Sequence, residues 1–227
     1  MKLIKRIIIV LLLIVLIIAC ALWSPWQYLH FNPLSIFGIN PPAKLARLEV
    51  SSLAGEIEIT IDGEKKGSVG PEGSPFLIED VNPGQRLVKL VRKSSNTHSY
   101  ITFEKLLNFA SDIDTVIAYE LGPTVEFSQG HVITAYKSYI HPTTTDLNIT
   151  TMPPNTEAFL DGQDIGATPL TNISLDLKSV HTLKLTKTGY ETVQINILPN
   201  TPDGRAKLLG YEINVNTDLF LIPIRVD

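Results

Sequence analysis

The chain has 227 residues, a formal net charge of −4 and a single cysteine, Cys20. This length allows one or two domains, and the lone cysteine excludes disulfides, a thiol nucleophile and a thiolate metal site in everything that follows it. The 19 basic residues are scattered and are outnumbered by 23 acidic ones. Nucleic acid is therefore not expected as a partner, because a phosphate-binding surface needs clustered basic residues.

Residues 1–23 predict a membrane anchor. Three basic residues, Lys2, Lys5 and Arg6, precede an uncharged apolar run over residues 7–23. The run approaches the roughly 20 apolar residues that a helix needs to cross a bilayer. Because basic residues stay on the cytoplasmic side, we expect a single-pass protein of the cell membrane whose C-terminal domains are extracytoplasmic.

A lipoprotein signal is the alternative reading of the same segment. Ile17-Ile18-Ala19-Cys20 is similar to a bacterial lipobox, in which the cysteine is lipidated and becomes the new N-terminus. Ordinary signal cleavage is a third possibility. The apolar run continues through residues 21–23, which favours the uncleaved transmembrane helix over a lipoprotein anchored at Cys20.

Residues 24–45 predict a stalk. Four prolines among aromatic residues favour an extended, semi-rigid segment over a helix. Three of the 19 basic residues precede the apolar run, so 16 basic and 23 acidic residues remain after it, a formal charge of −7.

From residue 46 onward the hydrophobic pattern has a period of two, which predicts an all-β fold. Leu48 and Val50 alternate with charged residues, as do Ile57, Ile59 and Ile61, and such alternation is typical of half-buried strands. Further strands are expected at residues 86–92, 115–121, 131–136, 147–152, 182–187, 192–198 and 219–226. Residues 105–110 are the one place where a helical turn is expected. Regular turn residues between the strands favour antiparallel β-sandwiches.

An internal repeat divides this region. Residues 59–63 end in Asp62-Gly63 and are followed by Gly67, and residues 158–162 end in Asp161-Gly162 and are followed by Gly166. An Asp-Gly pair supplies the positive φ angles of a tight hairpin, so Gly162 is expected to have one. Two copies predict two small β-sandwich domains in tandem, at residues 46–138 and 146–227, joined by a linker at residues 139–145.

The second unit resembles the PEGA domain, a small all-β module of prokaryotic surface proteins. Residues 147–152 correspond to the opening strand of the family pattern. Residues 153–156 correspond to the Pro-x-Gly-Ala-like turn that follows it, with Asn155 in place of glycine. Asparagine also enters the left-handed region, so the exchange is tolerable. The remaining motif residues follow in order: Asp161, Gly162, Gly166, Thr168, Pro169, Gly189 and Tyr190.

The first unit resembles the family more loosely. It keeps Asp62, Gly63, Gly67 and a Pro83-Gly84 turn but lacks the Thr-Pro-Leu and Gly-Tyr elements. We interpret it as a divergent PEGA-like domain. An embellished sandwich that shares the hairpin alone is the alternative.

No catalytic, cofactor-binding or metal-binding residues are predicted. The histidines lack the spacing of metal ligands, although His131 and His141 could converge in space. Residues 111–115 begin like a calcium loop but lack its glycine and terminal glutamate. No serine lies in a Gly-x-Ser-x-Gly elbow.

These features predict a non-catalytic binding or structural protein of the cell surface or envelope. The resemblance implies a role in envelope assembly, with an envelope protein or a glycan as the partner. Binding is expected at hairpin tips and edges, including Gln163-Asp164 and residues 200–210. The alternatives are an envelope enzyme acting on glycan or peptide, and a sensory ectodomain that signals through a partner.

Overall fold

The structure is a computed structural model that describes residues 12, 44–71, 73–94 and 99–223. Lys44–Asp227 form one compact unit. Cys20 and nearly all of the predicted anchor and stalk lie outside the described residues. Among the residues that are described, no helix is long and apolar enough to span a bilayer.

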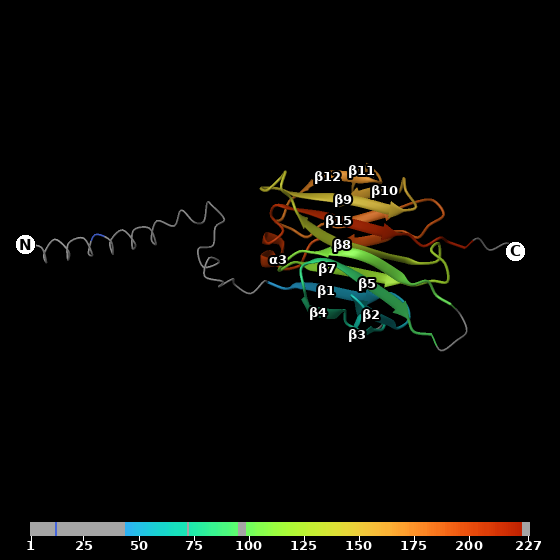
Figure 1. The fold of residues 1–227 in the computed structure, drawn as a ribbon. Helices are drawn as coiled ribbons and strands as arrows, with labels where there is room; N and C mark the ends of the chain where they lie inside the picture. Colours follow the sequence, from blue (N-terminus) through green and yellow to red (C-terminus); the bar gives the residue numbers. More distant parts are fainter. Residues whose placement is uncertain (1–11, 13–43, 72, 95–98, 224–227) are drawn as a thin grey trace, which may run out of the picture. The chain divides into compact units, whose positions relative to one another are not determined.

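The compact unit is almost entirely β-structure, as predicted (Figure 1). Its elements are β1 (Ala46–Ser52), β2 (Ile57–Ile61), β3 (Glu64–Val69), β4 (Phe76–Val81), β5 (Gly84–Arg92), β6 (Phe103–Phe109), β7 (Asp114–Glu120), β8 (Gln129–Lys137), β9 (Thr145–Met152), β10 (Glu157–Leu160), β11 (Gln163–Ala167), β12 (Leu170–Leu175), β13 (Thr182–Thr186), β14 (Val193–Asn196), α3 (Pro202–Ala206) and β15 (Tyr211–Asp218). A seven-stranded sheet, in the order β12-β9-β15-β8-β7-β1-β4, runs through both halves. Two four-stranded sheets, β3-β2-β5-β6 and β11-β10-β13-β14, complete the unit.

The two halves have the same strand topology. In the first, β4-β1-β7 contribute to the large sheet while β3-β2-β5-β6 form a separate sheet; in the second, β12-β9-β15 and β11-β10-β13-β14 play the same parts. Strand β8 lies between them and is antiparallel to both β7 and β15. The repeat that was visible in the hairpins therefore extends to all seven strands of each half.

The large sheet is mixed, which differs from the antiparallel sheets expected from the sequence. β1 pairs with β7 in parallel, and β9 pairs with β15 in parallel. In each half these two strands are the first and the last of the repeat. Parallel neighbours need a long crossover connection, and here the other five strands of the half supply it.

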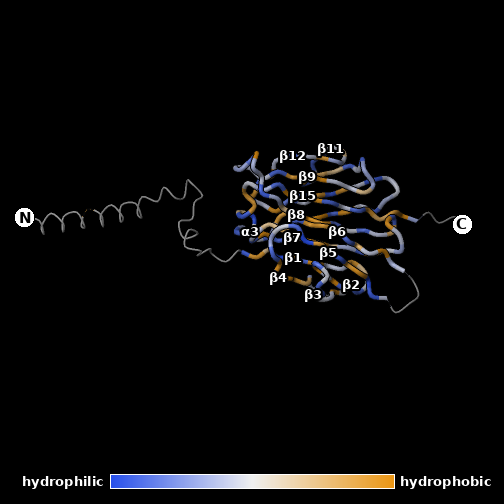
Figure 2. The backbone as a smooth tube through the Cα atoms, viewed as in Figure 1, coloured by the Kyte–Doolittle hydropathy of each residue, from blue (hydrophilic) through white to orange (hydrophobic). Residues whose placement is uncertain are grey.

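The four-stranded sheets cover opposite faces of the large sheet. Val132 and Ile133 are adjacent in β8, so their side chains point to opposite faces. Val132 belongs to the hydrophobic core of the first half and Ile133 to that of the second. Figure 2 shows hydrophobic residues along the central strands of the unit, including β7, β8 and β15.

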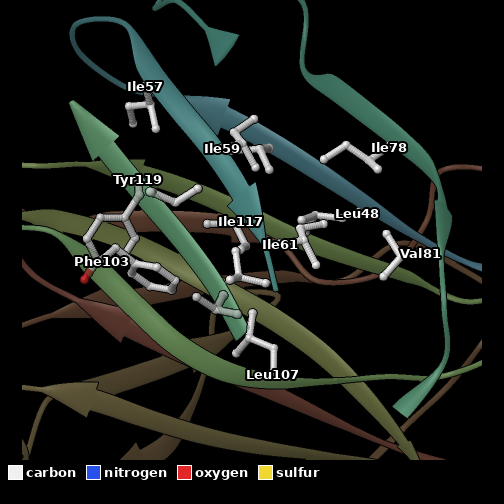
Figure 3. Close-up of a cluster of buried hydrophobic side chains, with 14 of the residues drawn as sticks. Leu48, Ile57, Ile59, Ile61, Ile78, Val81, Phe103, Leu107, Ile117 and Tyr119 are labelled. Carbon is white, nitrogen blue, oxygen red and sulfur yellow. The ribbon is translucent and has the colours of Figure 1, made fainter. Parts of the chain in front are cut away.

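The core of the first half illustrates how the sequence pattern is used. Leu48 of β1 and Ile59 of β2 are fully buried and face each other across the two sheets (Figure 3). Side chains of three further strands close the cluster: Val81, Phe103, Leu107, Ile117 and Tyr119. The alternate residues of β1 and β2, which include Arg47, Glu49 and Glu58, are half-buried on the opposite faces of their sheets.

Two predicted elements are wrong. Residues 105–110, expected as a helical turn, belong largely to β6, where Phe103, Leu107 and Phe109 are buried and Leu106 is 59% exposed. The adjacent leucines imitated a helical pattern, but pairing with β5 fixes the strand. The last strand is β15 at Tyr211–Asp218; residues 219–223 contribute no strand beyond a bridge between Leu221 and Tyr190.

Candidate binding site

A cavity lies beside β14, and we call it the β14 cleft. Its volume is about 460 Å³, within the range typical of ligand sites. The large sheet forms the floor of the cleft, with residues of β1, β7 and β8. The facing wall is β14 together with residues of the segment 197–208. The second half's small sheet ends at β14, so the part of the large sheet that it leaves uncovered forms the floor.

An ion pair fixes one side of the floor. Arg47 of β1 and Asp114 of β7 are paired in the parallel ladder, and the guanidinium donates to both carboxylate oxygens, from Nε at 2.5 Å and from the second amino group at 3.0 Å. The hydrogen bond to Asp114 raises the pKa of Arg47. A bidentate pair of this kind holds both side chains in one orientation.

A second group of charges lies at the rim. Asp112 accepts hydrogen bonds from Lys207 at 2.8 Å and from Lys44 at 3.1 Å, and these bonds, that from Lys207 first, lower its pKa. The two lysines are exposed and Asp112 is half-buried, so the pairs contribute little to stability. They connect the beginning of β1 with the segment that follows α3.

Two titratable side chains of the cleft, His131 and Glu49, have no partner in the described residues. Burial lowers the pKa of His131 to about 4, so its imidazole is neutral at pH 7, and it makes no hydrogen bond with that part of the chain. Glu49 of β1 makes neither a hydrogen bond nor an ion pair there. The hydroxyl of Thr217, directly across from His131 on β15, is likewise buried without a partner among the residues described.

One buried arginine fixes the wall that residues 197–208 form. Arg205 in α3 is 7% exposed and donates to four main-chain carbonyls, those of Leu177, Lys178, Pro199 and Asn200, at 2.8–3.1 Å. Carbonyls of two separate loops are thereby tied to one side chain. Thr201 caps α3 by accepting from the N–H of Gly204. Residues 200–207 are therefore an ordered wall of the cleft.

The cleft combines paired charges with polar and apolar side chains. Asp112 and Asp114 are held in ion pairs with lysine and arginine side chains, and no cysteine lines the cleft. Within the described residues no group of three or more histidines, cysteines and acids could hold a metal ion. His141, the suggested companion of His131, instead lies 2.6 Å from Asp146. The cleft offers hydrogen-bonding groups, one unpaired carboxylate and apolar wall residues such as Val116 and Ile195.

The predicted hairpin residues lie outside the cleft and have a repeated architectural role. Asp62 and Gly63 have φ of 50° and 84°, and Asp161 and Gly162 have 51° and 82°, which confirms the positive φ expected for Gly162. A bulge follows at the same place in both hairpins, opposite the step from Ile59 to Thr60 in one and from Ala158 to Phe159 in the other. Gly67 and Gly166 follow this bulge.

Each hairpin aspartate also binds the third strand of its sheet. Asp62 Oδ1 accepts from the N–H of Leu87, and Asp161 Oδ1 accepts from that of Thr182, both at 2.9 Å. The other carboxylate oxygen, Oδ2, is paired with the side chain of the residue just before that N–H donor. This residue is Arg86, at 3.3 Å, in the first half and His181, at 2.6 Å, in the second. We call these groups the aspartate clamps.

The other motif residues organise the turn before β10. Thr168 is buried, accepts from the N–H of Thr156, and is linked to the chain by a cis bond to Pro169. Asn155 has a φ of 56°, so it does take the left-handed conformation inferred from the sequence. Its carbonyl accepts from Lys187 Nζ at 3.0 Å. In the first half Gly55, with a φ of 74°, stands at the corresponding turn.

Two further motif residues close the second half. Gly189 has a φ of 85° and lies in a turn in which the N–H of Tyr190 binds the carbonyl of Lys187 at 3.0 Å. Tyr190 then forms the bridge to Leu221.

The sequence anticipated part of the cleft. Residues 200–210, expected as a binding loop, contribute Asn200, Thr201, Gly204, Lys207 and Leu208 to it, whereas Gln163 and Asp164 do not line it. The floor was missed. The sequence does not reveal that β14 comes to lie over β1 and β7, so Glu49 is not among the predicted binding residues.

Comparison with known protein families agrees with the resemblance found in the sequence. The family model of the PEGA domain matches residues 144–205, which covers β9 to α3 of the second half. This match indicates a surface-exposed module. None of the curated protein sequences compared with the chain matches it.

Proposed function

We propose that this protein is anchored in the cell membrane by its N-terminal segment and binds an envelope component outside the cytoplasm without catalysing a reaction. The β14 cleft is the observation that carries the binding role. It combines unpaired polar groups with an ordered wall, and its Asp112 and Asp114 are held in ion pairs. The apolar run at residues 7–23 supports the anchor.

The topology supports a structural contribution as well. Both halves share one continuous sheet through β8, so the unit is a rigid platform rather than two independent modules. Such a platform would hold the floor and the walls of the cleft in one arrangement. We regard the first half as a divergent PEGA-like domain because it repeats the topology of the matched second half.

Site-directed photocrosslinking in intact cells tests the proposal. A photoreactive residue at Gln194, in the cleft, is expected to capture an envelope protein or glycan in the membrane fraction, with the N-terminal segment retained. The control position is Gln163, which is exposed but lies outside the cleft. A protein in the soluble fraction, a mature chain beginning at a lipidated Cys20, or equal capture from both positions would contradict parts of the proposal.

Activity measurements separate binding from the enzymatic alternative. The full chain, with or without added divalent metal, is expected to leave peptidoglycan, peptides and model esters intact. Turnover that disappears on Glu49→Gln or His131→Gln would establish an envelope enzyme instead, because these are the unpaired titratable side chains of the cleft.

A further inference from the structure

The geometry points to the β14 cleft as a docking site for an extended peptide strand that carries a basic side chain. The strand would add to the free edge of β14 and lie over the exposed floor formed by β1 and β7. This inference rests on the proposed binding role and specifies the chemical class of the partner.

The first observation is the free edge. β14 is the terminal strand of its sheet and pairs with β13 alone. The N–H of Ile197 binds the carbonyl of His181 at 3.1 Å. Because hydrogen-bonded pairs alternate in an antiparallel ladder, Val193 and Ile195 also bind β13, while the main-chain groups of Gln194 and Asn196 point away from it. In the described part of the chain, no other strand receives those groups.

The second observation is the space beyond this edge. Gln194 and Asn196 both line the cleft, so their outward main-chain groups face a cavity rather than a neighbouring strand. Sheets pack about 10 Å apart, and strands within a sheet about 4.8 Å apart. A strand hydrogen-bonded to β14 would therefore lie above β7 and β1, with every second side chain directed onto Val116 and its surroundings.

The third observation is the charge on the floor. Arg47 is neutralised by Asp114, and Lys44 and Lys207 by Asp112. His131 is neutral, as its lowered pKa indicates. The carboxylate of Glu49 is thus the charge without a partner in the cleft's described residues, and a lysine or arginine of the incoming strand would complement it. Strand addition with specificity from alternate side chains is an established mode of peptide recognition.

Selection from a phage-displayed library of random twelve-residue peptides tests the inference on the full chain in detergent micelles. The enriched peptides are expected to contain a lysine or arginine within an alternating apolar pattern. Glu49→Lys is expected to select acidic peptides instead, and Glu49→Gln to weaken the original ones about tenfold. Glu104→Gln is the matched control, since Glu104 is an exposed carboxylate on β6, away from the cleft, and it should change nothing.

Backbone methylation of a selected peptide provides the decisive measurement. N-methylation of alternate residues should abolish binding for one set, whose N–H groups face β14, and spare the other set. Asn196→Pro should abolish binding of all peptides, because it removes an outward donor of the edge; thermal melting confirms that the variant is folded.

Three results would overturn the inference: no peptide enrichment above empty micelles, equal tolerance of methylation in both sets, or binding to a glycan array that Glu49→Lys abolishes. These outcomes leave the proposed function intact if Gln194 still yields specific crosslinks in cells. Loss of those crosslinks, by contrast, would remove the binding role itself.

Discussion

The aspartate clamp of the second half should make stability depend on pH, and Asp161→Asn measures the effect. His181 Nδ1 lies 2.6 Å from the carboxylate of Asp161, and Nε2 lies 2.6 Å from the carbonyl of Asp176. Both neighbours are acceptors. Both ring nitrogens must therefore donate, which only the imidazolium form does.

The directions of the pKa shifts agree with this geometry. Burial lowers the pKa of His181, but the hydrogen bonds to Asp161 and to the Asp176 carbonyl outweigh it and the net shift is upward. Its contribution to stability is full below the unfolded value of about 6.5 and is lost as the pH rises through the raised folded pKa. The pKa of Asp161 is lowered, chiefly by the hydrogen bond from His181. The carboxylate's contribution is thus present above about pH 4 and lost as the pH falls through the lowered pKa.

The expected magnitude follows from which bonds remain. The amide introduced by Asp161→Asn would keep an acceptor for the N–H of Thr182 but lose the charge-assisted bond to His181, a type worth about 1.5–3 kcal/mol. The Asp161 side chain is 49% exposed, so we expect the lower end, about 1.5 kcal/mol at pH 5.5. At pH 9, where the imidazole is neutral, we expect a loss of about 0.5 kcal/mol.

Urea denaturation of Lys44–Asp227 at pH 5.5 and pH 9 provides the assay. Asp62→Asn is the matched control, because its partner Arg86 stays charged throughout this range, and its cost should be the same at both values. A penalty for Asp161→Asn that does not change with pH, or one for Asp62→Asn that does, would refute the reasoning.

Three further predictions concern the same unit. Gly162→Val should lower the free energy of unfolding by more than ~1 kcal/mol in thermal melts; no atom lies within 4 Å of the added Cβ, so the cost is backbone strain at a φ of 82°, and an unchanged melting temperature would contradict the hairpin assignment. Arg205→Met should cost about 2–4 kcal/mol in urea denaturation, because it leaves four part-buried hydrogen bonds to main-chain carbonyls without their donor; a loss below about 0.5 kcal/mol would mean that water replaces the guanidinium. Leu48→Ala and Leu147→Ala, in the two different cores, should each cost about 3 kcal/mol and shift one common transition, since both halves share a sheet; two separate transitions in calorimetry would show independent domains.

The sequence alone determined the local features of this protein. The alternation of Leu48 and Val50 with charged residues predicts a half-buried strand because successive side chains point to opposite faces. The Asp-Gly pairs predict tight turns because few other residues adopt positive φ there. The PEGA resemblance of the second half could be found in the same way, since its motif residues occupy turns whose conformations depend on the residue type.

The arrangement of strands was decided by the tertiary structure. Val132 and Ile133 are equivalent in a sequence pattern, yet they enter different cores because β8 is the strand around which the two halves are arranged. β6 was mistaken for a helical turn because Leu106 is exposed and a lone sequence does not reveal that. The β14 cleft depends on β14 lying over β1 and β7, which are more than 70 residues away in the chain. Contacts between residues so far apart are fixed by the packing of the whole sheet, so no local pattern around Glu49 or Gln194 could have predicted them.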